Sequence, residues 1–104
     1  MKKFLVTLLA FVSLSIFAQT KQDGNELLKI INGPDFHQMF AIGYIRGVAD
    51  HMPCIPAEVT NGQSVDVVKK YLESNPETRH EYMGNLVIKA LNKAYPCKKT
   101  APKG

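Results

Sequence analysis

Three histidines and two cysteines are the residues of this chain best suited to chemistry. His37 and His51 would lie ~21 Å apart on one helix at 1.5 Å per residue, too far apart to share a metal ion. No histidine or carboxylate pair at helical spacing faces the same side as a cysteine, and His80 beside Glu81 is interpreted as a solvated pair. The sequence therefore predicts no metal site and no cofactor.

No other set of side chains forms a recognisable catalytic centre. There is no serine in a Gly-x-Ser-x-Gly turn and no glycine-rich loop after a strand. An enzyme needs at least a nucleophile, or a paired acid and base, in a cleft. We therefore predict a non-enzymatic protein without catalytic residues.

The first residues have the layout of a secretory signal peptide. Positively charged Lys2 and Lys3 precede an apolar run from Phe4 to Ala18, which is too short to span a bilayer comfortably. We expect residues 1–18 to be removed, with a retained membrane anchor as the alternative. The mature chain would then be periplasmic and no longer bound to the membrane.

Cys54 and Cys97 are the only cysteines, and an exported protein meets an oxidising compartment. One intramolecular pairing is possible, and closing its ~43-residue loop would add about 4 kcal/mol of stability in the chain-entropy model. A domain of the remaining 86 residues is marginal without such help. We predict this disulfide, with two free thiols or an intermolecular bridge as the alternatives.

The charge is more balanced than the formal value of +4 suggests. Two lysines lie in the signal, and three lie in a tail that also contains proline and glycine. Residues 21–97 carry eight Lys/Arg against nine Asp/Glu. A nucleic-acid partner is therefore not expected, because such proteins present a basic face with interleaved aromatics.

The hydrophobic pattern predicts an all-α fold, a small four-helix domain over residues 19–97 with a basic flexible tail over 98–104. No segment alternates with period two over more than four residues, so no sheet is expected. Asn25 would cap a first helix ending at Ile31, and Asp35 would cap a second helix running to about His51.

The other two helices have clear start signals. Thr60 and Gln63 form a capping box, which predicts a third helix after Thr60. Asn75-Pro76 predicts the cap and first residue of a fourth helix, which would form an α-hairpin with the third. Its apolar residues recur with helical period up to Tyr95, just before Cys97.

The second helix is expected to be central and buried on several sides. Phe36, Phe40, Gly43, Tyr44 and Gly47 fall on one side of it at 100° per residue. A glycine inside a helix costs ~1 kcal/mol relative to alanine. Two of them one turn apart therefore indicate that another backbone crosses closely there.

Taken together, four ordered blocks over residues 36–97 resemble the Rap/Tai immunity-protein family. The blocks are Phe40-x-x-Gly43-Tyr44-Ile45-x-Gly47-Val48-x-Asp50, Cys54-x-Pro56-x-x-Val59-Thr60-x-x-Gln63, Val68-x-x-Tyr71-Leu72-x-x-x-Pro76-Glu77-x-Arg79 and Leu86-Val87-x-x-Ala90-Leu91-x-x-Ala94-Tyr95-Pro96-Cys97.

The resemblance implies a small exported helical protein, often dimeric, in which Cys54 and Cys97 form a structural disulfide. Gly43, Tyr44, Gly47 and Asp50 match the family's central helix, and Thr60 and Gln63 match its capping residues. It also implies a protein partner, a peptidoglycan amidase delivered by type VI secretion, and makes a homodimer possible. A holdase-like or structural helical protein of the periplasm is the alternative from another class.

No contact residue for a partner follows from these motifs, because all of them are explained as architecture. We expect recognition in rigid loops, and the candidates are the connector over residues 53–63 and the turn Ser74-Asn75-Pro76-Glu77. Tyr71 and Tyr82 are the candidate exposed aromatics.

Overall fold

The computed structural model describes residues 21–98, and the expected signal peptide and most of the expected basic tail lie outside this range. Four α-helices and one 3₁₀ turn follow in order: α2 (Gly24–Ile31), α3 (Asp35–Ala49), α4 (Asn61–Ser74), η1 (Pro76–Thr78) and α5 (Met83–Ala94). No strand occurs between residues 21 and 98 beyond one isolated bridge from Asp23 to Tyr82. The predicted all-α fold with four helices is confirmed.

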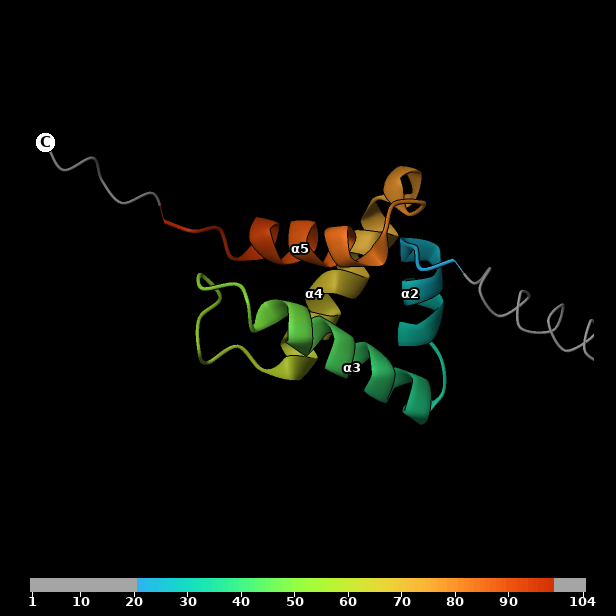
Figure 1. The fold of residues 1–104 in the computed structure, drawn as a ribbon, viewed down its shortest axis with the longest axis horizontal. Coiled ribbons are helices and arrows are strands. Elements are labelled where there is room, and N and C mark those ends of the chain that lie inside the picture. Colours follow the sequence, from blue (N-terminus) through green and yellow to red (C-terminus); the bar gives the residue numbers. More distant parts are fainter. Residues whose placement is uncertain (1–20, 99–104) are drawn as a thin grey trace, which may run out of the picture.

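Helix α4 is the element on which the others pack. It contacts α5, α3 and α2, and its contact with α5 is the most extensive in the fold. Figure 1 shows α4 crossing between α5 and α3, with α2 closing one end of the bundle. All four helices contribute to the core, which consists of Leu27, Ile31, Ala41, Ile45, Val68, Leu72, Met83, Leu86, Val87, Ala90 and Leu91.

Helix α2 begins one residue before its predicted cap. The Asp23 carboxylate, not the Asn25 side chain, caps it by accepting the backbone N–H of Glu26 at 2.9 Å. The backbone N–H of Asn25 instead donates to the Arg79 carbonyl at 3.1 Å. The prediction of Asn25 as cap is wrong because a distant segment bonds the first amides of this helix.

Helix α4 begins as predicted. The backbone N–H of Gln63 donates to the Thr60 hydroxyl at 3.1 Å, and the Gln63 side chain accepts the Thr60 N–H at 2.8 Å. These reciprocal bonds complete the capping box, which satisfies two N–H groups that a helix start leaves unpaired.

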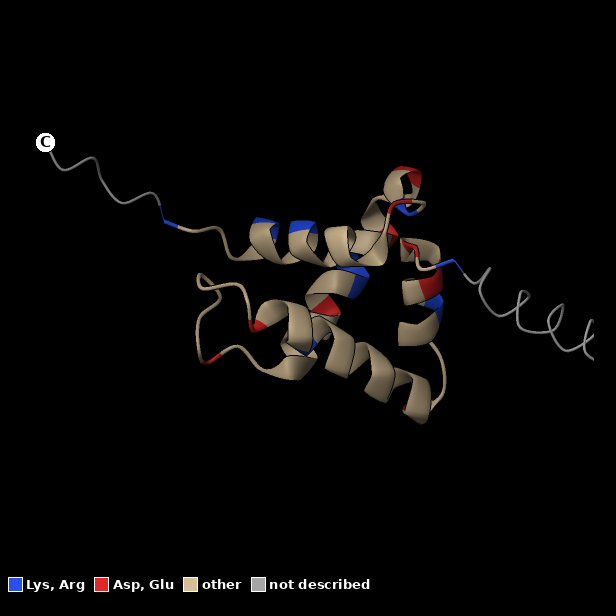
Figure 2. Ribbon diagram, viewed as in Figure 1, with Lys and Arg blue, Asp and Glu red and all other residues tan. Residues whose placement is uncertain are grey.

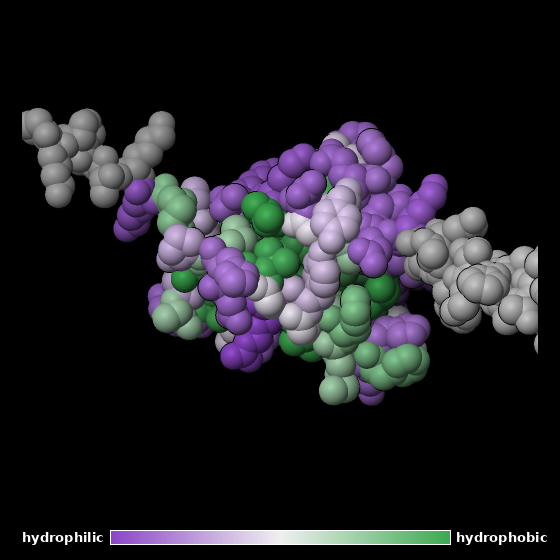
Figure 3. All heavy atoms as spheres, viewed as in Figure 1, coloured by the Kyte–Doolittle hydropathy of each residue, from purple (hydrophilic) through white to green (hydrophobic). Residues whose placement is uncertain are grey.

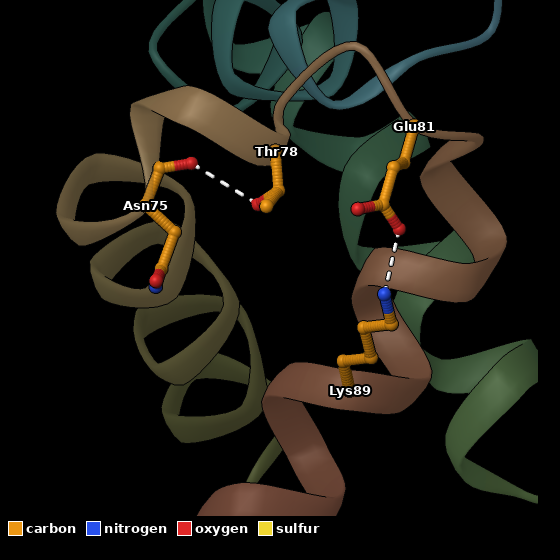
Figure 4. Close-up of polar contacts among 4 residues, drawn as sticks. All are labelled: Asn75, Thr78, Glu81 and Lys89. Atoms are coloured by element: carbon orange, nitrogen blue, oxygen red, sulfur yellow. Dashed lines mark hydrogen bonds and ion pairs between the residues drawn. The ribbon is translucent and has the colours of Figure 1, made fainter.

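The predicted start of the last helix at Asn75-Pro76 is wrong. The Asn75 side chain donates to the Tyr71 carbonyl at 2.8 Å, so it completes the end of α4. Pro76–Thr78 form only one 3₁₀ turn, in which the Thr78 hydroxyl donates to the Asn75 carbonyl at 3.2 Å (Figure 4). The two helices therefore do not form a tight α-hairpin, because the segment 75–82 separates them.

Helix α5 has the buried face that its period predicts. Leu86, Val87 and Leu91 are fully buried, and Met83 and Ala90 nearly so. Glu81, just before this helix, forms an ion pair with Lys89 at 2.7 Å and is not paired with His80 as expected (Figure 4). That pair is exposed, so it adds little to stability.

Candidate interaction surfaces

The three histidines considered for chemistry form no cluster with other potential metal ligands among the described residues. His37, His51 and His80 are all exposed, and His37 makes an edge contact with the ring of Phe36. Among residues 21–98, no three His, Cys, Asp or Glu side chains are placed to hold a metal ion.

The predicted disulfide is present. Cys54 and Cys97 are joined across a sequence separation of 43, with their Cα atoms 5.0 Å apart. Cys54 lies in the connector between α3 and α4, and Cys97 lies just after α5. The bond thus anchors the middle of the connector to the end of α5.

The connector itself borders an open hollow of about 550 Å³. Charged and polar residues line part of this hollow, among them Arg46, Asp50, Glu58 and Thr60. Pro56, Ala57 and Glu58 are exposed at the turn of the connector. Two prolines and the disulfide restrict this loop, so it presents its exposed residues in a defined shape.

The second candidate loop lies at the other end of α4. The connector precedes Asn61 and the turn Pro76–Thr78 follows Ser74, so the length of α4, ~21 Å at 1.5 Å per residue, separates them. Figure 1 shows the connector and this turn on opposite sides of the molecule. The two predicted loops therefore form two separate surfaces.

Helix α3 is not buried on several sides, and this prediction is wrong for the single chain. Only Ala41 and Ile45 are buried, whereas Phe36, Met39 and Phe40 are 68%, 71% and 55% exposed. Figure 3 shows hydrophobic side chains gathered at the lower right, over the first half of α3. The core meets the side of α3 that carries Ala41 and Ile45, and Tyr44 is partly buried against it, whereas the side that carries the two phenylalanines is exposed.

The two glycines of α3 are also solvent exposed. A Cβ atom added at Gly43 or at Gly47 would meet nothing within 4 Å. The expected close crossing of a second backbone is therefore absent among the described residues of this chain. By contrast, Gly24 and Gly84 do mark close contacts, since a Cβ at Gly84 would lie 3.0 Å from the Tyr44 hydroxyl.

Tyr44 links α3 to the start of α5. Its ring stacks on Phe40 with centroids 6.1 Å apart, and its hydroxyl lies beside Gly84. Burial, with a hydrogen bond to Tyr82 and the charge of that residue, raises the pKa of Tyr44 to about 12. Tyr44 is therefore neutral at physiological pH and acts as a packing residue.

The remaining family-motif residues take structural or exposed positions. Thr60 and Gln63 form the cap of α4, Gly43 and Gly47 are exposed on α3, and Asp50 is exposed at the C-cap position just after α3. Of the two candidate aromatics, Tyr82 is 53% exposed and Tyr71 is partly buried. The exposed Phe36, Met39 and Phe40 were missed as surface residues, since helical period alone does not say which apolar side meets the core.

None of the helices between residues 21 and 98 is both long and apolar enough to cross a membrane. The described part of the chain is a small helical body with one disulfide, a restrained connector and an exposed apolar helix face. The chain matches the Rap1a immunity proteins over residues 23–97, and it belongs to that family. It is thus of the immunity class, whose members have an effector protein as partner. No curated protein and no solved structure shows a significant match.

Proposed function

We propose that this protein is a periplasmic immunity protein that occludes the active site of a peptidoglycan amidase delivered by type VI secretion. Membership of the Rap1a immunity family supports the immunity role. The signal-like N-terminus and the disulfide suit an exported protein. An inhibitor of a wall-degrading enzyme has to act where the wall is.

The observation that carries the proposal is the restrained connector. Pro56, Ala57 and Glu58 are exposed on a loop that the Cys54–Cys97 bond fixes to α5. A restrained loop can bind at an active-site cleft with little loss of conformational entropy. A standard interface buries ~800 Å² per partner, so the blocking surface would include residues around the connector as well as the loop itself.

The test is inhibition of a candidate type VI amidase by the purified mature protein. Near-equimolar protein should abolish peptidoglycan cleavage and form a complex on a sizing column. In cells, rescue from a periplasmic amidase should require residues 1–18. No complex and no rescue across amidase families would refute the proposal.

Charge reversals at the two candidate loops locate the blocking surface. Glu58→Arg changes the connector, and Glu77→Arg makes the same exposed change at η1. We expect Glu58→Arg to weaken inhibition at least tenfold and Glu77→Arg to leave it unchanged. The reverse result would move the blocking surface to the turn at Pro76–Thr78.

The exposed apolar side chains of α3 favour one other function, that of a holdase for unfolded chains. A holdase binds many clients and exposes more apolar surface when activated. Fluorescence of a dye for apolar surface separates the two functions. Strong, reversible dye binding on acidification from neutral pH would favour the holdase.

We also propose that the protein acts as a homodimer, as the family resemblance implies. The apolar surface of α3 is compatible with such an assembly, since contiguous exposed apolar side chains mark interaction sites. Sedimentation equilibrium of the mature protein tests this directly. A monomer at all concentrations would contradict it.

A further inference from the structure

The exposed side of α3 carries four residues at the spacing of a coiled-coil seam. Phe36, Phe40, Gly43 and Gly47 follow one another at intervals of four, three and four, and we call them the Phe–Gly stripe. This alternation is the a/d repeat that makes one helix face fit another. All four residues are exposed in the single chain.

The stripe has bulky side chains at one end and none at the other. Phe36 and Phe40 project from the first half of the helix. Gly43 and Gly47 in the second half leave open space, since an added Cβ would meet nothing within 4 Å. The stripe therefore has projections and recesses in equal number.

We propose that this stripe is the surface on which a second copy of the chain packs, with the two α3 helices antiparallel. This inference rests on the proposed homodimer and assigns its interface. When two antiparallel copies are aligned at the middle of the stripe, Phe36 lies opposite the partner's Gly47. Phe40 then lies opposite Gly43 of the partner subunit, so every projection meets a recess.

The charges favour the same orientation. No Lys, Arg, Asp or Glu occurs from residue 36 to residue 45, and Figure 2 shows this part of α3 in tan. Asp35 stands at one end of the stripe and Arg46 near the other. In the antiparallel pair, Asp35 lies about 3 Å along the axis from the partner's Arg46, whereas a parallel pair would face like charges with each other.

Asp50, on the same side of α3 as Arg46, does not oppose this pairing. It would reach the N-terminal end of the partner helix, where the helix dipole is positive. In the antiparallel arrangement the positive end of each helix dipole also lies beside the negative end of the other, which is favourable. A second copy fits this face better than an amidase cleft does, because a two-fold interface needs a surface complementary to itself.

The pairing would leave both connectors free. Each connector follows the C-terminal end of its own α3, so the antiparallel pair places the two loops at opposite ends of the seam. The expected complex contains two copies of each protein.

The dissociation constant of the mature dimer, measured by sedimentation equilibrium, tests the seam. Filling the recess with Gly43→Phe should weaken the dimer by about 30-fold or more, as loss of a buried interface anchor does. Gly62→Phe is the matched control. Gly62 is also an exposed helix glycine, but it lies at the start of α4, where an added Cβ would have the Thr60 hydroxyl 3.9 Å away. This control should leave the constant unchanged.

A swap tests the register. Phe40→Gly alone and Gly43→Phe alone should each weaken the dimer, whereas the double variant exchanges projection and recess and should restore it to within a few-fold. Circular dichroism of each variant checks that the monomer still folds. Failure of the double variant to restore the dimer would overturn the proposed register.

Two further outcomes separate this inference from the proposed function. A wild-type dimer that Gly43→Phe does not weaken would overturn the seam and leave the homodimer standing. A wild-type monomer whose amidase inhibition is lost in Gly43→Phe would overturn the homodimer and assign the stripe to the effector.

Discussion

Helices α3 and α5 both have an apolar side with helical period, and the fold treats them in opposite ways. In α5 the residues at this period, such as Leu86 and Leu91, are fully buried against α4 and its neighbours. In α3 the matching residues Phe36 and Phe40 face outward. A helical period of apolar residues therefore shows which side of a helix tends to be buried. It does not show whether the same chain or another molecule buries that side.

The disulfide ties the connector after α3 to the chain just after α5, and its loss is the largest expected effect. Cys97→Ser should lower the free energy of unfolding by about 4 kcal/mol, because the reduced chain regains loop entropy when unfolded. Urea unfolding of the variant and of the wild type, with and without reductant, measures it. Labelling of both thiols in the folded wild type without reductant would contradict the bond.

Two large-to-small substitutions test directly whether the apolar side of α5 is buried and that of α3 is exposed. Leu86→Ala in α5 should cost about 3 kcal/mol of unfolding free energy, since it empties part of a fully buried site. Phe40→Ala in α3 should change monomer stability by no more than about 0.5 kcal/mol. Urea unfolding at concentrations too low for association measures both. Equal losses would show that α3 is covered within the monomer.

Replacing glycine by alanine should change the free energy of unfolding in opposite directions at packed and at open positions. Gly24→Ala should destabilise the domain by about 1–3 kcal/mol, because its Cβ would overlap Leu86 and crowd the Arg79 carbonyl. Gly43→Ala should stabilise the monomer by about 1 kcal/mol through helix propensity. Thermal unfolding at low protein concentration compares them. A destabilising Gly43→Ala would mean that α3 is tightly packed there.

The smallest expected effect concerns Tyr44, where α3 meets the start of α5. Its pKa is raised to about 12 in the folded state, from 10.0. The unfolded chain therefore releases this proton first as the pH rises, and the domain loses stability between pH 10 and about 12. Tyr44→Phe should remove the part of the stability loss at alkaline pH that Tyr44 causes. The measurement is the midpoint of urea unfolding as a function of pH. If the midpoint of the variant falls with pH as steeply as that of the wild type, the prediction is wrong.

The sequence predicted the local architecture well where one signal acts alone. Strong local rules predicted the cap formed by Thr60 and Gln63 and the buried side of α5. The pairing of Cys54 with Cys97 was predictable because the chain has no other cysteine. Asn75 and Asn25 are different, because asparagine suits a helix end as well as a helix start. Their roles were decided by the Tyr71 carbonyl and by the segment around Arg79, which sequence spacing does not reveal.

The candidate surfaces were predicted only in part. Prolines and a cysteine marked the connector as rigid, but nothing in the sequence said that the turn after Ser74 lies at the far end of α4. The glycines of α3 were interpreted as a sign that another backbone crosses closely, and the described part of this chain contains no such crossing. Which side of α3 meets the core depends on tertiary packing by Ala41 and Ile45.

The backbone bonds at the start of α2 also bear on how the chain folds. The Gly24 N–H donates to the Glu81 carbonyl at 3.1 Å, and the Met83 N–H donates to the Gln22 carbonyl at 2.9 Å. The first helix of the domain is thus completed by a segment from near the end of the chain. Contacts between such distant segments form late, since the loop between them must close first. A nascent chain would therefore hold α2 incomplete until nearly all of the domain has been synthesised.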